Sequence, residues 1–179
     1  MDYEVRKATL ADREAIAQLI AESTRQLSRN EYSDSQIEGA ITSVFGVDSD
    51  LIHDGTYFVA DKDGTLIGCG GWSRRNKLYG SDQFADRDAG YLDPENDPAK
   101  IRAFFVHPQH ARKGVARQIL SRCEREALDH GFRALELLAT LPGIKFYEAC
   151  GYARKGFFDL ELANGVKLEF VPMRKELRR

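Results

Sequence analysis

Apolar and polar positions follow two different periods along the first part of the chain, and these periods predict its first elements. In "YEVRKAT" (residues 3–9) the two kinds alternate as in a strand, and Thr9 with Asp12 gives a helix-start signal before apolar residues at helical spacing. Ser33 and Gln36 fit a capping box that would begin a second helix. Its apolar stripe would consist of Ile37, Ile41, Val44 and Phe45.

The middle of the chain combines a hairpin with a long irregular segment. The strands "TYFVAD" and "TLIGCGGW" flank Asp63-Gly64, a dipeptide that supplies the positive φ of a tight turn. Residues 74–99 show no sustained periodicity and contain two prolines, with four basic and six acidic side chains. An irregular segment of this length is typical of a functional loop or of a mobile one.

The second half predicts alternating strands and helices. A buried strand, "KIRAFFVH", precedes a helix over about 114–130, and "FRALELLAT" is another buried strand. A short helix, "LPGIKFYEAC", ends at Gly151, and two strands around Asn164-Gly165 form a terminal hairpin. The order β-α-α-β-β-β-α-β-α-β-β predicts a mixed sheet with a parallel pair near its middle, because strand–helix–strand crossovers join parallel strands.

Composition narrows the class of protein. The 179 residues suit one domain, 1–179, and a net charge of −2 argues against nucleic acid as the main partner. No apolar run approaches the ~20 residues that span a bilayer, and the N-terminus lacks a secretory signal. We therefore expect a soluble, cytoplasmic protein with no membrane association.

Cysteines and histidines do not form a clear site. Cys69, Cys123 and Cys150 lack C-x-x-C pairing and read as reduced core residues, although a catalytic thiol served by a distant histidine is the alternative. His107 and His110 lie three apart but have no carboxylate or thiol nearby, which favours a solvated loop over a ligand pair. No metal site is predicted.

The stretch "VHPQHARKGVARQIL" (residues 106–120) carries the strongest chemical signal. A glycine, Gly114, lies in a basic run at the predicted start of a helix, where unpaired N–H groups and the helix dipole attract phosphate. The run contains neither a P-loop nor a dinucleotide-binding fingerprint. By itself the run is equally consistent with an ordinary basic helix N-terminus.

Three features together resemble the GCN5-related N-acetyltransferase family. Residues 111–116 are similar to its R/Q-x-x-G-x-G/A signature, with Ala111 departing at the first position. "FFVHP" resembles the family's strand before this turn, and "FYEACGY" its F-Y-E-x-x-G-[FY] segment. The order of elements also matches. The resemblance implies an α/β (α+β) fold: a mostly antiparallel sheet of about seven strands, with a splayed parallel pair at its centre and helices on both faces.

The same resemblance implies a donor substrate, acetyl-CoA, and the residues that hold it. The backbone of Phe104, Phe105 and Val106 would hold the pantetheine arm and the acetyl carbonyl. Thr140 occupies a position where relatives have a coenzyme-contacting asparagine, and its hydroxyl either replaces that asparagine or caps the following helix. The pyrophosphate would lie on the amides of Arg112, Lys113, Gly114, Val115, Ala116 and Arg117.

The family resemblance implies a proton donor and leaves the general base open. Tyr147 matches the tyrosine that returns a proton to the coenzyme A thiolate, and core packing is its alternative role. The strand before the turn has no carboxylate to act as a general base. Either a water chain relays the proton or an acid of the long loop reaches the site. Those acids are Asp93, Glu95 and Asp97.

The acceptor implied by the family is a primary amine of a small molecule or a peptide. Trp72, Arg74, Arg75 and Tyr79 are the candidates to line its groove. A non-catalytic acyl-CoA-binding sensor of the same fold is the alternative function, because of the missing carboxylate. The terminal strands favour a homodimer, since exposed strand edges pair readily.

Overall fold

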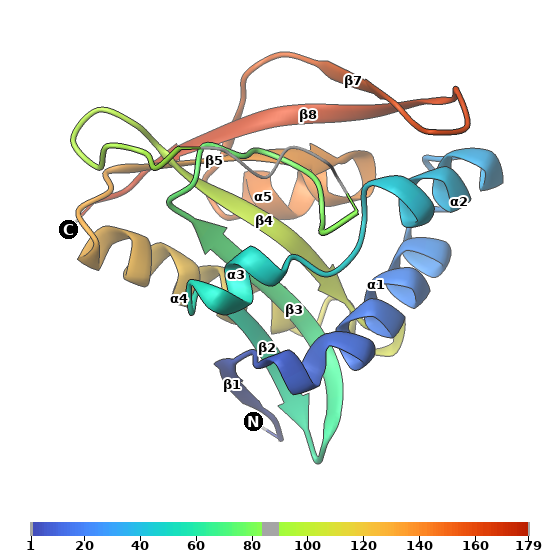
Figure 1. Cartoon of the computed structure of the whole chain (residues 1–179), viewed down its shortest axis with the longest axis horizontal. Coiled ribbons are helices and arrows are strands. Elements are labelled where there is room, and N and C mark those ends of the chain that lie inside the picture. The colour runs from blue at the N-terminus through green and yellow to red at the C-terminus, as the bar shows by residue number, and fades with distance from the viewer. Residues whose placement is uncertain (1, 84–89, 179) are drawn as a thin grey trace.

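The computed structural model describes residues 2–83 and 90–178, so part of the long loop, residues 84–89, lies outside the described residues. An eight-stranded sheet with the order β1-β2-β3-β4-β5-β8-β6 forms its centre, and β7 pairs with β8 (Figure 1). Only β4 and β5 are parallel among the described strand pairs. The strands are β1 (Glu4–Lys7), β2 (Tyr57–Lys62), β3 (Thr65–Ser73), β4 (Ala99–Val106), β5 (Ala134–Thr140), β6 (Ala153–Arg154), β7 (Phe158–Glu161) and β8 (Lys167–Glu176).

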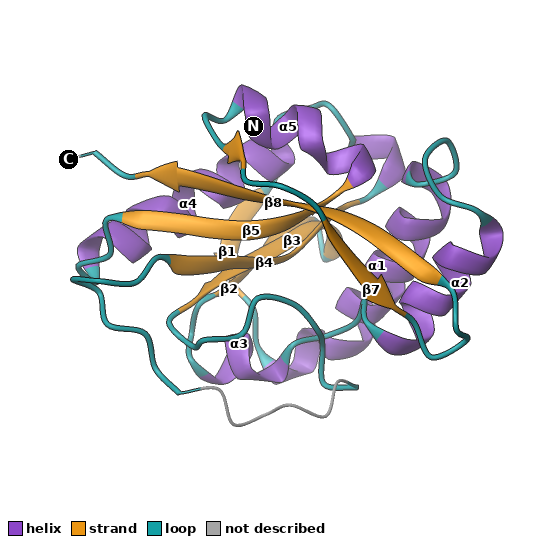
Figure 2. Ribbon diagram, turned by 90° about the horizontal axis from the view of Figure 1, so that it is seen from above, coloured by secondary structure: helices purple, strands orange, loops and turns teal. Residues whose placement is uncertain are grey.

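Helices cover both faces of the sheet. Figure 2 shows α4 and α5 on one face and α1, α2 and α3 on the other. The helices are α1 (Arg13–Leu27), α2 (Asp34–Ser43), α3 (Ser49–His53), α4 (Val115–Asp129) and α5 (Ile144–Ala149). Three 3₁₀ turns precede α1, α4 and α5: η1 (Leu10–Asp12), η2 (Pro108–His110) and η3 (Leu141–Gly143). The expected mixed α/β fold is therefore confirmed.

Local sequence signals account for most element boundaries. Ser33 and Gln36 form the predicted capping box, with Gln36 N donating to Ser33 Oγ over 3.2 Å. Asp63 and Gly64 take the positive φ of the predicted hairpin. The second hairpin has a wider turn than predicted, with Leu162 N donating to Val166 O and only Gly165 at positive φ within it.

Two short elements, α3 and β6, have no counterpart in the sequence prediction, because five and two residues are too short to show a period. The predicted stripe of the second helix also extends too far. The helix α2 ends at Ser43, so Phe45 lies beyond it. The Phe45 ring packs edge-on against the rings of Phe105 and Phe170, whose centroids lie 5.4 and 6.2 Å from its own.

The parallel strands β4 and β5 separate soon after they begin. Their register pairs only Ala99 with Leu135 and Lys100 with Glu136. Beyond Lys100 the strand β4 turns away from β5, which Figure 1 shows as a V-shaped opening in the sheet. The second edge of β4 stays with β3 up to Val106. The centre of the sheet is therefore split while its outer strands remain paired.

The start of α4 lies very close to β3. A Cβ added to Gly68 would lie 2.6 Å from Val115 Cγ1 and 3.3 Å from Ile119 Cδ1. Only a residue without a side chain lets the helix pack this closely. Gly68 thus sets the depth at which the first turn of α4 lies on the sheet.

We expect Gly68→Ala to lower the free energy of unfolding by about 1–3 kcal/mol, because the added methyl overpacks the interface with α4. Urea unfolding measures this loss. Gly90→Ala is the control, since a Cβ there meets no atom within 4 Å. Equal stability of the two variants would contradict the close approach.

An ion-pair network fastens the N-terminal strand. Arg6 donates to Asp12 Oδ1 and Oδ2 over 2.8 and 2.9 Å, and its Nη2 lies 2.9 Å from Asp61 Oδ2. The hydrogen bond from Arg6 lowers the pKa of Asp12 to about 2. Since Arg6 lies on β1 and Asp61 on β2, the network joins β1 to its neighbour and to η1.

This network predicts a pH dependence of stability. A carboxyl group with a lowered folded-state pKa stabilises the fold above its unfolded value, and that contribution is lost as the pH falls through the folded value. Asp12→Asn should therefore destabilise the protein at pH 7, and the difference from the natural protein should shrink between about pH 4 and pH 2. Urea unfolding at several pH values tests this; a constant difference would contradict it.

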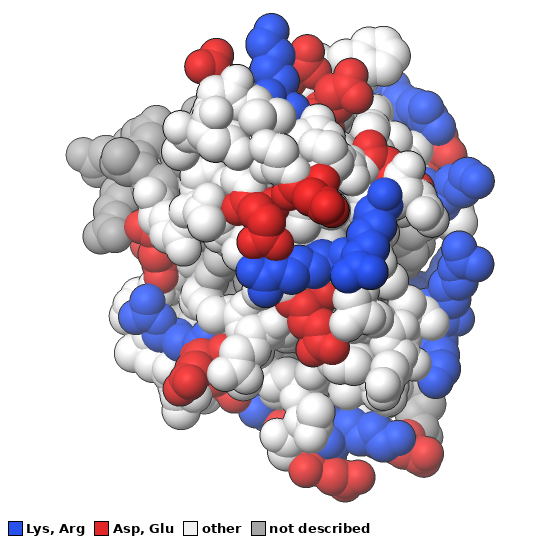
Figure 3. Space-filling view, turned by 90° about the vertical axis from the view of Figure 1, so that its right-hand side faces the viewer, with Lys and Arg blue, Asp and Glu red and all other residues white. Residues whose placement is uncertain are grey.

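The sequence predicts no membrane-spanning or polyanion-binding feature, and the described helices and one face of the surface bear on that prediction. None of the helices in the described ranges combines the length and the apolar composition needed to cross a bilayer. On the face at the right of Figure 1, basic and acidic side chains are interspersed (Figure 3). That face therefore carries no continuous basic surface of the kind that nucleic-acid backbones require.

Candidate functional site

The separation of β4 and β5 opens a cleft of about 90 Å³ between them, which we call the central cleft. One water needs roughly 10–15 Å³ of such volume, so the cleft has room for a small molecule or for the end of a longer chain. Both sheet faces contribute to its walls. It is lined by Val44, Phe45, Gly46, Leu78, Tyr79, Gly80, residues 101–105, Leu137, Leu138, Thr140, Tyr147 and Phe170.

A bulge in β4 forms one wall of the central cleft. The register with β3 passes from Gly71↔Arg102 to Cys69↔Phe105, so Ala103 and Phe104 both face a single residue of β3. Ala103 takes a positive φ of 56°. A bulge leaves backbone groups outside the ladder, and β5 is absent here as a second partner. The bulge therefore presents backbone N–H and C=O groups to the cleft.

The bulge also changes the face to which side chains point. Phe104 and Val106 pack with the core on the α4 and α5 side, whereas Ala103 and Phe105 pack with the core of α1 and α3. Val106 itself does not line the central cleft and pairs with Gly68. Phe104 and Phe105 thus give the cleft one aromatic ring on each face.

Tyr147 lies in the cleft wall that α5 provides. It is 8% exposed, and its ring packs edge-on against Phe104 and Tyr152, with centroids 6.5 and 5.7 Å away. Burial raises the pKa of the phenol well above its ordinary value. The hydroxyl therefore stays protonated at neutral pH and can serve as a proton donor, while its ring also belongs to the core.

Thr140 lies at the end of β5, where that strand passes into η3. Its backbone pairs with Phe170 on β8, and its side chain makes no capping hydrogen bond to η3. Its side chain lines the central cleft together with Tyr147. Of the sequence-predicted residues, the cleft therefore brings together Phe104, Phe105, Thr140, Tyr147 and Tyr79.

The basic turn after β4 forms a separate feature at the start of α4. Arg112 and Gly114 take positive φ values of 61° and 86°, and a Cβ on Gly114 would meet no atom within 4 Å. The glycine is therefore required by backbone conformation and leaves open space above the turn. The first hydrogen bond of the helix runs from Gln118 N to Gly114 O over 3.1 Å. The amides of residues 115–117 come before it and have no acceptor within the helix.

Side chains around this turn differ in burial. Arg112, Lys113 and Arg117 are exposed, and Arg117 Nη2 lies 3.5 Å from Ala149 O. Val115 is buried under the turn, and Ala116 is partly buried. Exposed cations surround open backbone amides, so the turn is suited to bind an anion.

A buried ion pair, Arg102 with Asp48, lies beside the cleft. The two residues are 4% and 1% exposed, and Arg102 Nη2 contacts both Asp48 Oδ2 and Gly80 O. Burial raises the pKa of the Asp48 carboxyl, while Arg102 and Lys77 oppose this shift. The sequence analysis missed this pair; the signal was an arginine inside the otherwise apolar strand "KIRAFFVH".

The four residues expected to line an acceptor groove lie in different places. Tyr79 lines the central cleft. Trp72 is fully buried and packs against Phe132 on the α4 side, which corrects its expected position in a groove. Arg75 forms a bidentate ion pair with Asp54, and Arg74 lies over the Tyr91 ring. Trp72, Arg74 and Arg75 are thus not among the cleft-lining residues.

The acids of the long loop form their own turn. Asp93 accepts hydrogen bonds from Glu95 N and Asn96 Nδ2, and Asp97 accepts one from Asp93 N. None of the three lines the central cleft. In the described residues no group of three or more His, Cys, Asp or Glu side chains could hold a metal ion.

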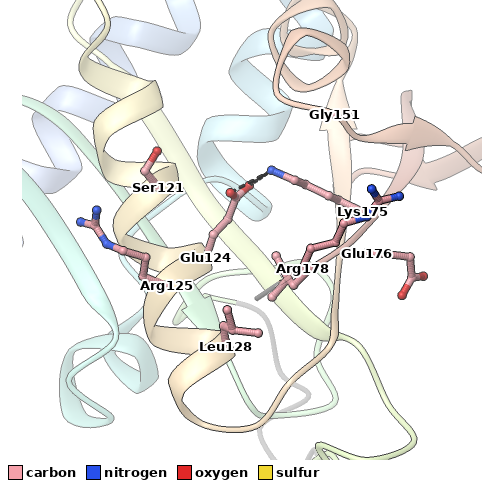
Figure 4. Close-up of a pocket in the computed structure, with 9 residues that line it drawn as sticks. Ser121, Glu124, Arg125, Leu128, Gly151, Lys175, Glu176 and Arg178 are labelled. Atoms are coloured by element: carbon pink, nitrogen blue, oxygen red, sulfur yellow. Dashed lines mark hydrogen bonds and ion pairs between the residues drawn. The ribbon is translucent and has the colours of Figure 1, made fainter.

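A second hollow lies between α4 and the end of β8, away from the cleft (Figure 4). It is open and polar, and Lys175 reaches across it to both carboxylate oxygens of Glu124 over 2.9 Å. The ammonium group of Lys175 and the carboxylate of Glu124 therefore neutralise each other. The central cleft remains the better candidate for chemistry, since it combines exposed backbone with a protonated phenol.

Known proteins share sequence features and the fold with this chain. A sequence model described as "Acetyltransferase (GNAT) family" matches residues 15–152. No curated protein sequence matches the chain. Among solved structures, a GCN5-related N-acetyltransferase from Rhodopseudomonas palustris is 19% identical with a TM-score of 0.73, over 99% of this chain and 97% of that chain.

Two further structures share the fold and were solved with a bound coenzyme. The PaiA N-acetyltransferase from Thermoplasma acidophilum, in complex with coenzyme A, is 18% identical with a TM-score of 0.65, over 99% of this chain and 100% of that chain. A phosphinothricin acetyltransferase from Sinorhizobium meliloti, in complex with acetyl-CoA, is 19% identical with a TM-score of 0.64, over 99% and 89%.

Proposed function

Because the chain belongs to the acetyltransferase (GNAT) family, we propose that it transfers an acetyl group from acetyl-CoA to the primary amine of a small molecule or peptide. The observation that carries this proposal is the central cleft, where a bulged strand and a buried tyrosine meet. Acyl transfer needs hydrogen-bond donors for a developing oxyanion and a proton for the departing thiolate. The backbone of β4 and the phenol of Tyr147 are groups of these two kinds.

The turn after β4 fits the phosphates of coenzyme A. Open space above Gly114 and the amides of residues 115–117 suit a pyrophosphate, and Arg112, Lys113 and Arg117 supply positive charge. The neighbours solved with coenzyme A or acetyl-CoA support a coenzyme A ligand for this fold. In this proposal the pantetheine arm runs along Phe104, Phe105 and Val106 and passes Thr140.

Tyr147 is the proton donor in the proposed reaction. The amine nitrogen bonds to the acetyl carbon as the carbon–sulfur bond breaks, and the phenol gives its proton to the sulfur. The proton lost by the nitrogen leaves through water, because no carboxylate of the described residues lines the cleft. Burial keeps the phenol protonated until the thiolate forms. The phenolate left by the transfer is the stronger base, so it regains a proton through the water that takes the proton of the amine.

That absence of a cleft-lining carboxylate also favours a second function, a non-catalytic acyl-CoA-binding sensor. Both functions require coenzyme A binding. Thiol release from acetyl-CoA over a panel of polyamines, aminoglycosides, amino acids and peptides separates them. Turnover of any amine supports the transferase, and tight coenzyme binding without turnover supports the sensor.

We expect Gly114→Glu to weaken coenzyme A binding at least about tenfold, because it places a carboxylate beside the proposed phosphate site and strains a positive φ. Isothermal titration calorimetry measures the dissociation constant. Gly165→Glu is the matched control, since Gly165 has a φ of 78° and equally open surroundings. Unchanged affinity in Gly114→Glu would remove the phosphates from this turn.

Tyr147→Phe should lower kcat about 100-fold and leave coenzyme A affinity nearly unchanged, because it removes only the proton donor. Steady-state thiol release and calorimetry measure the two quantities. Tyr152→Phe is the control: its hydroxyl binds Glu124 over 3.1 Å, and its ring packs on Tyr147. An equal fall in both variants would assign Tyr147 to packing alone.

A further inference from the structure

Arg102 offers an unused hydrogen-bond donor beside the central cleft. Its Nη2 forms an ion pair with Asp48 and donates to Gly80 O. Its Nη1, like both carboxylate oxygens of Asp48, is buried and has no hydrogen-bond partner in the described parts of the chain. A buried guanidinium donor without a partner is costly. Because Arg102 lines the cleft, Nη1 is the donor left for a group that enters it.

The bulge places Arg102 on the side of the sheet opposite α4 and α5. Ile101 and Phe104 both pack with the α4 core, so the two residues between them share the other face. The ion pair of Arg102 with Asp48, at the start of α3, agrees with this placement. A ligand on Arg102 therefore approaches from the α1–α3 side, opposite to the basic turn before α4.

Charges of both signs lie near Arg102, and its unpartnered guanidinium edge decides which ligand it binds. Two buried cations, Arg102 and Lys77, attract the carboxylate of Asp48, and Lys77 is only 9% exposed. The nearby carboxylate of Asp82 is engaged by Ser49 and Arg13. The carboxylates of Asp48 and Asp50 both act on Arg102, and neither forms a hydrogen bond with its Nη1. A carboxylate is the group that an arginine edge binds most strongly.

The remaining cleft walls on this side are apolar. Phe45, Tyr79 and Phe170 line the same cleft as Arg102. Arg102 directly precedes the bulged residues Ala103 and Phe104 and lines the same cleft. A carboxylate on Arg102 can therefore belong to the same small molecule as an amine at the bulge, with an apolar side chain against the aromatic rings.

We propose that Arg102 binds the carboxylate of the acceptor, and that the acceptor is an α-amino acid with an apolar side chain. The inference rests on the proposed acetyl transfer and makes its acceptor more specific. Arg102 acts as a specificity-determining residue, and Asp48 positions it. A peptide N-terminus lacks the required carboxylate next to its amine and is a poor acceptor in this scheme.

Matched acceptors test the proposal through a ratio of rates. The natural protein should acetylate phenylalanine with a kcat/KM at least about tenfold above that of phenylalaninamide or 2-phenylethylamine. Arg102→Met should abolish this preference. Since Arg102→Met leaves Asp48 buried without its partner, the double variant Asp48→Asn/Arg102→Met removes both charges and keeps the test open if the single variant fails to fold.

Arg6→Met is the control, because Arg6 pairs with Asp12 and Asp61 and does not line the cleft. It should keep the preference of the natural protein. The ratio between two acceptors does not depend on the folded fraction, so a merely structural role of Arg102 would leave it unchanged. An unchanged ratio in the Arg102 variants, or equal rates for both acceptors in the natural protein, would overturn the proposal.

A binding measurement makes the inference independent of turnover. With coenzyme A present, calorimetry should show N-acetylphenylalanine binding at least about tenfold more tightly than N-acetyl-2-phenylethylamine, and the difference should vanish in the Asp48→Asn/Arg102→Met variant. Carboxylate-dependent binding without any thiol release would contradict the proposed function and still support the anion site. Equal binding of the two compounds would overturn the site.

Discussion

The separation of β4 from β5 after Lys100 is the constraint on which the rest of the structure depends. A strand inside a sheet normally uses both of its edges, and beyond this point β4 keeps only the edge toward β3. The bulge at Ala103 and Phe104 loosens part of that edge as well. Backbone polar groups thereby remain at the centre of the molecule, and a ligand can satisfy them where a strand would otherwise do so.

Much of this arrangement follows from local sequence. The capping box of α2, the Asp63-Gly64 hairpin and the amphipathic face of α4 are all decided by residues close together in the chain, so the pattern predicts them. The family resemblance carried by "FYEACGY" and the turn at Gly114 is confirmed by the family match over residues 15–152.

Other features depend on contacts between distant segments, and the sequence pattern could not predict them. Asp48 and Arg102 meet because the N-terminus of α3 lies against the bulged strand, and neither position is periodic. Trp72 resembled a groove residue in the sequence, but it pairs with Ile101 and its ring packs against Phe132 in the core under α4. A shift of one residue in register changes the face of every side chain beyond it, and single-residue irregularities leave little trace in composition.

The bulge in β4 also divides the two halves of the central cleft between separate cores. Residues that face α4 and α5 belong to one hydrophobic cluster, and those that face the helices of the other side belong to two others. Mutations on the second side can accumulate without repacking the first. During evolution, residues on the α1–α3 side of the sheet can therefore change while those on the α4–α5 side stay the same. Directed evolution of this protein can begin with the positions on the α1–α3 side.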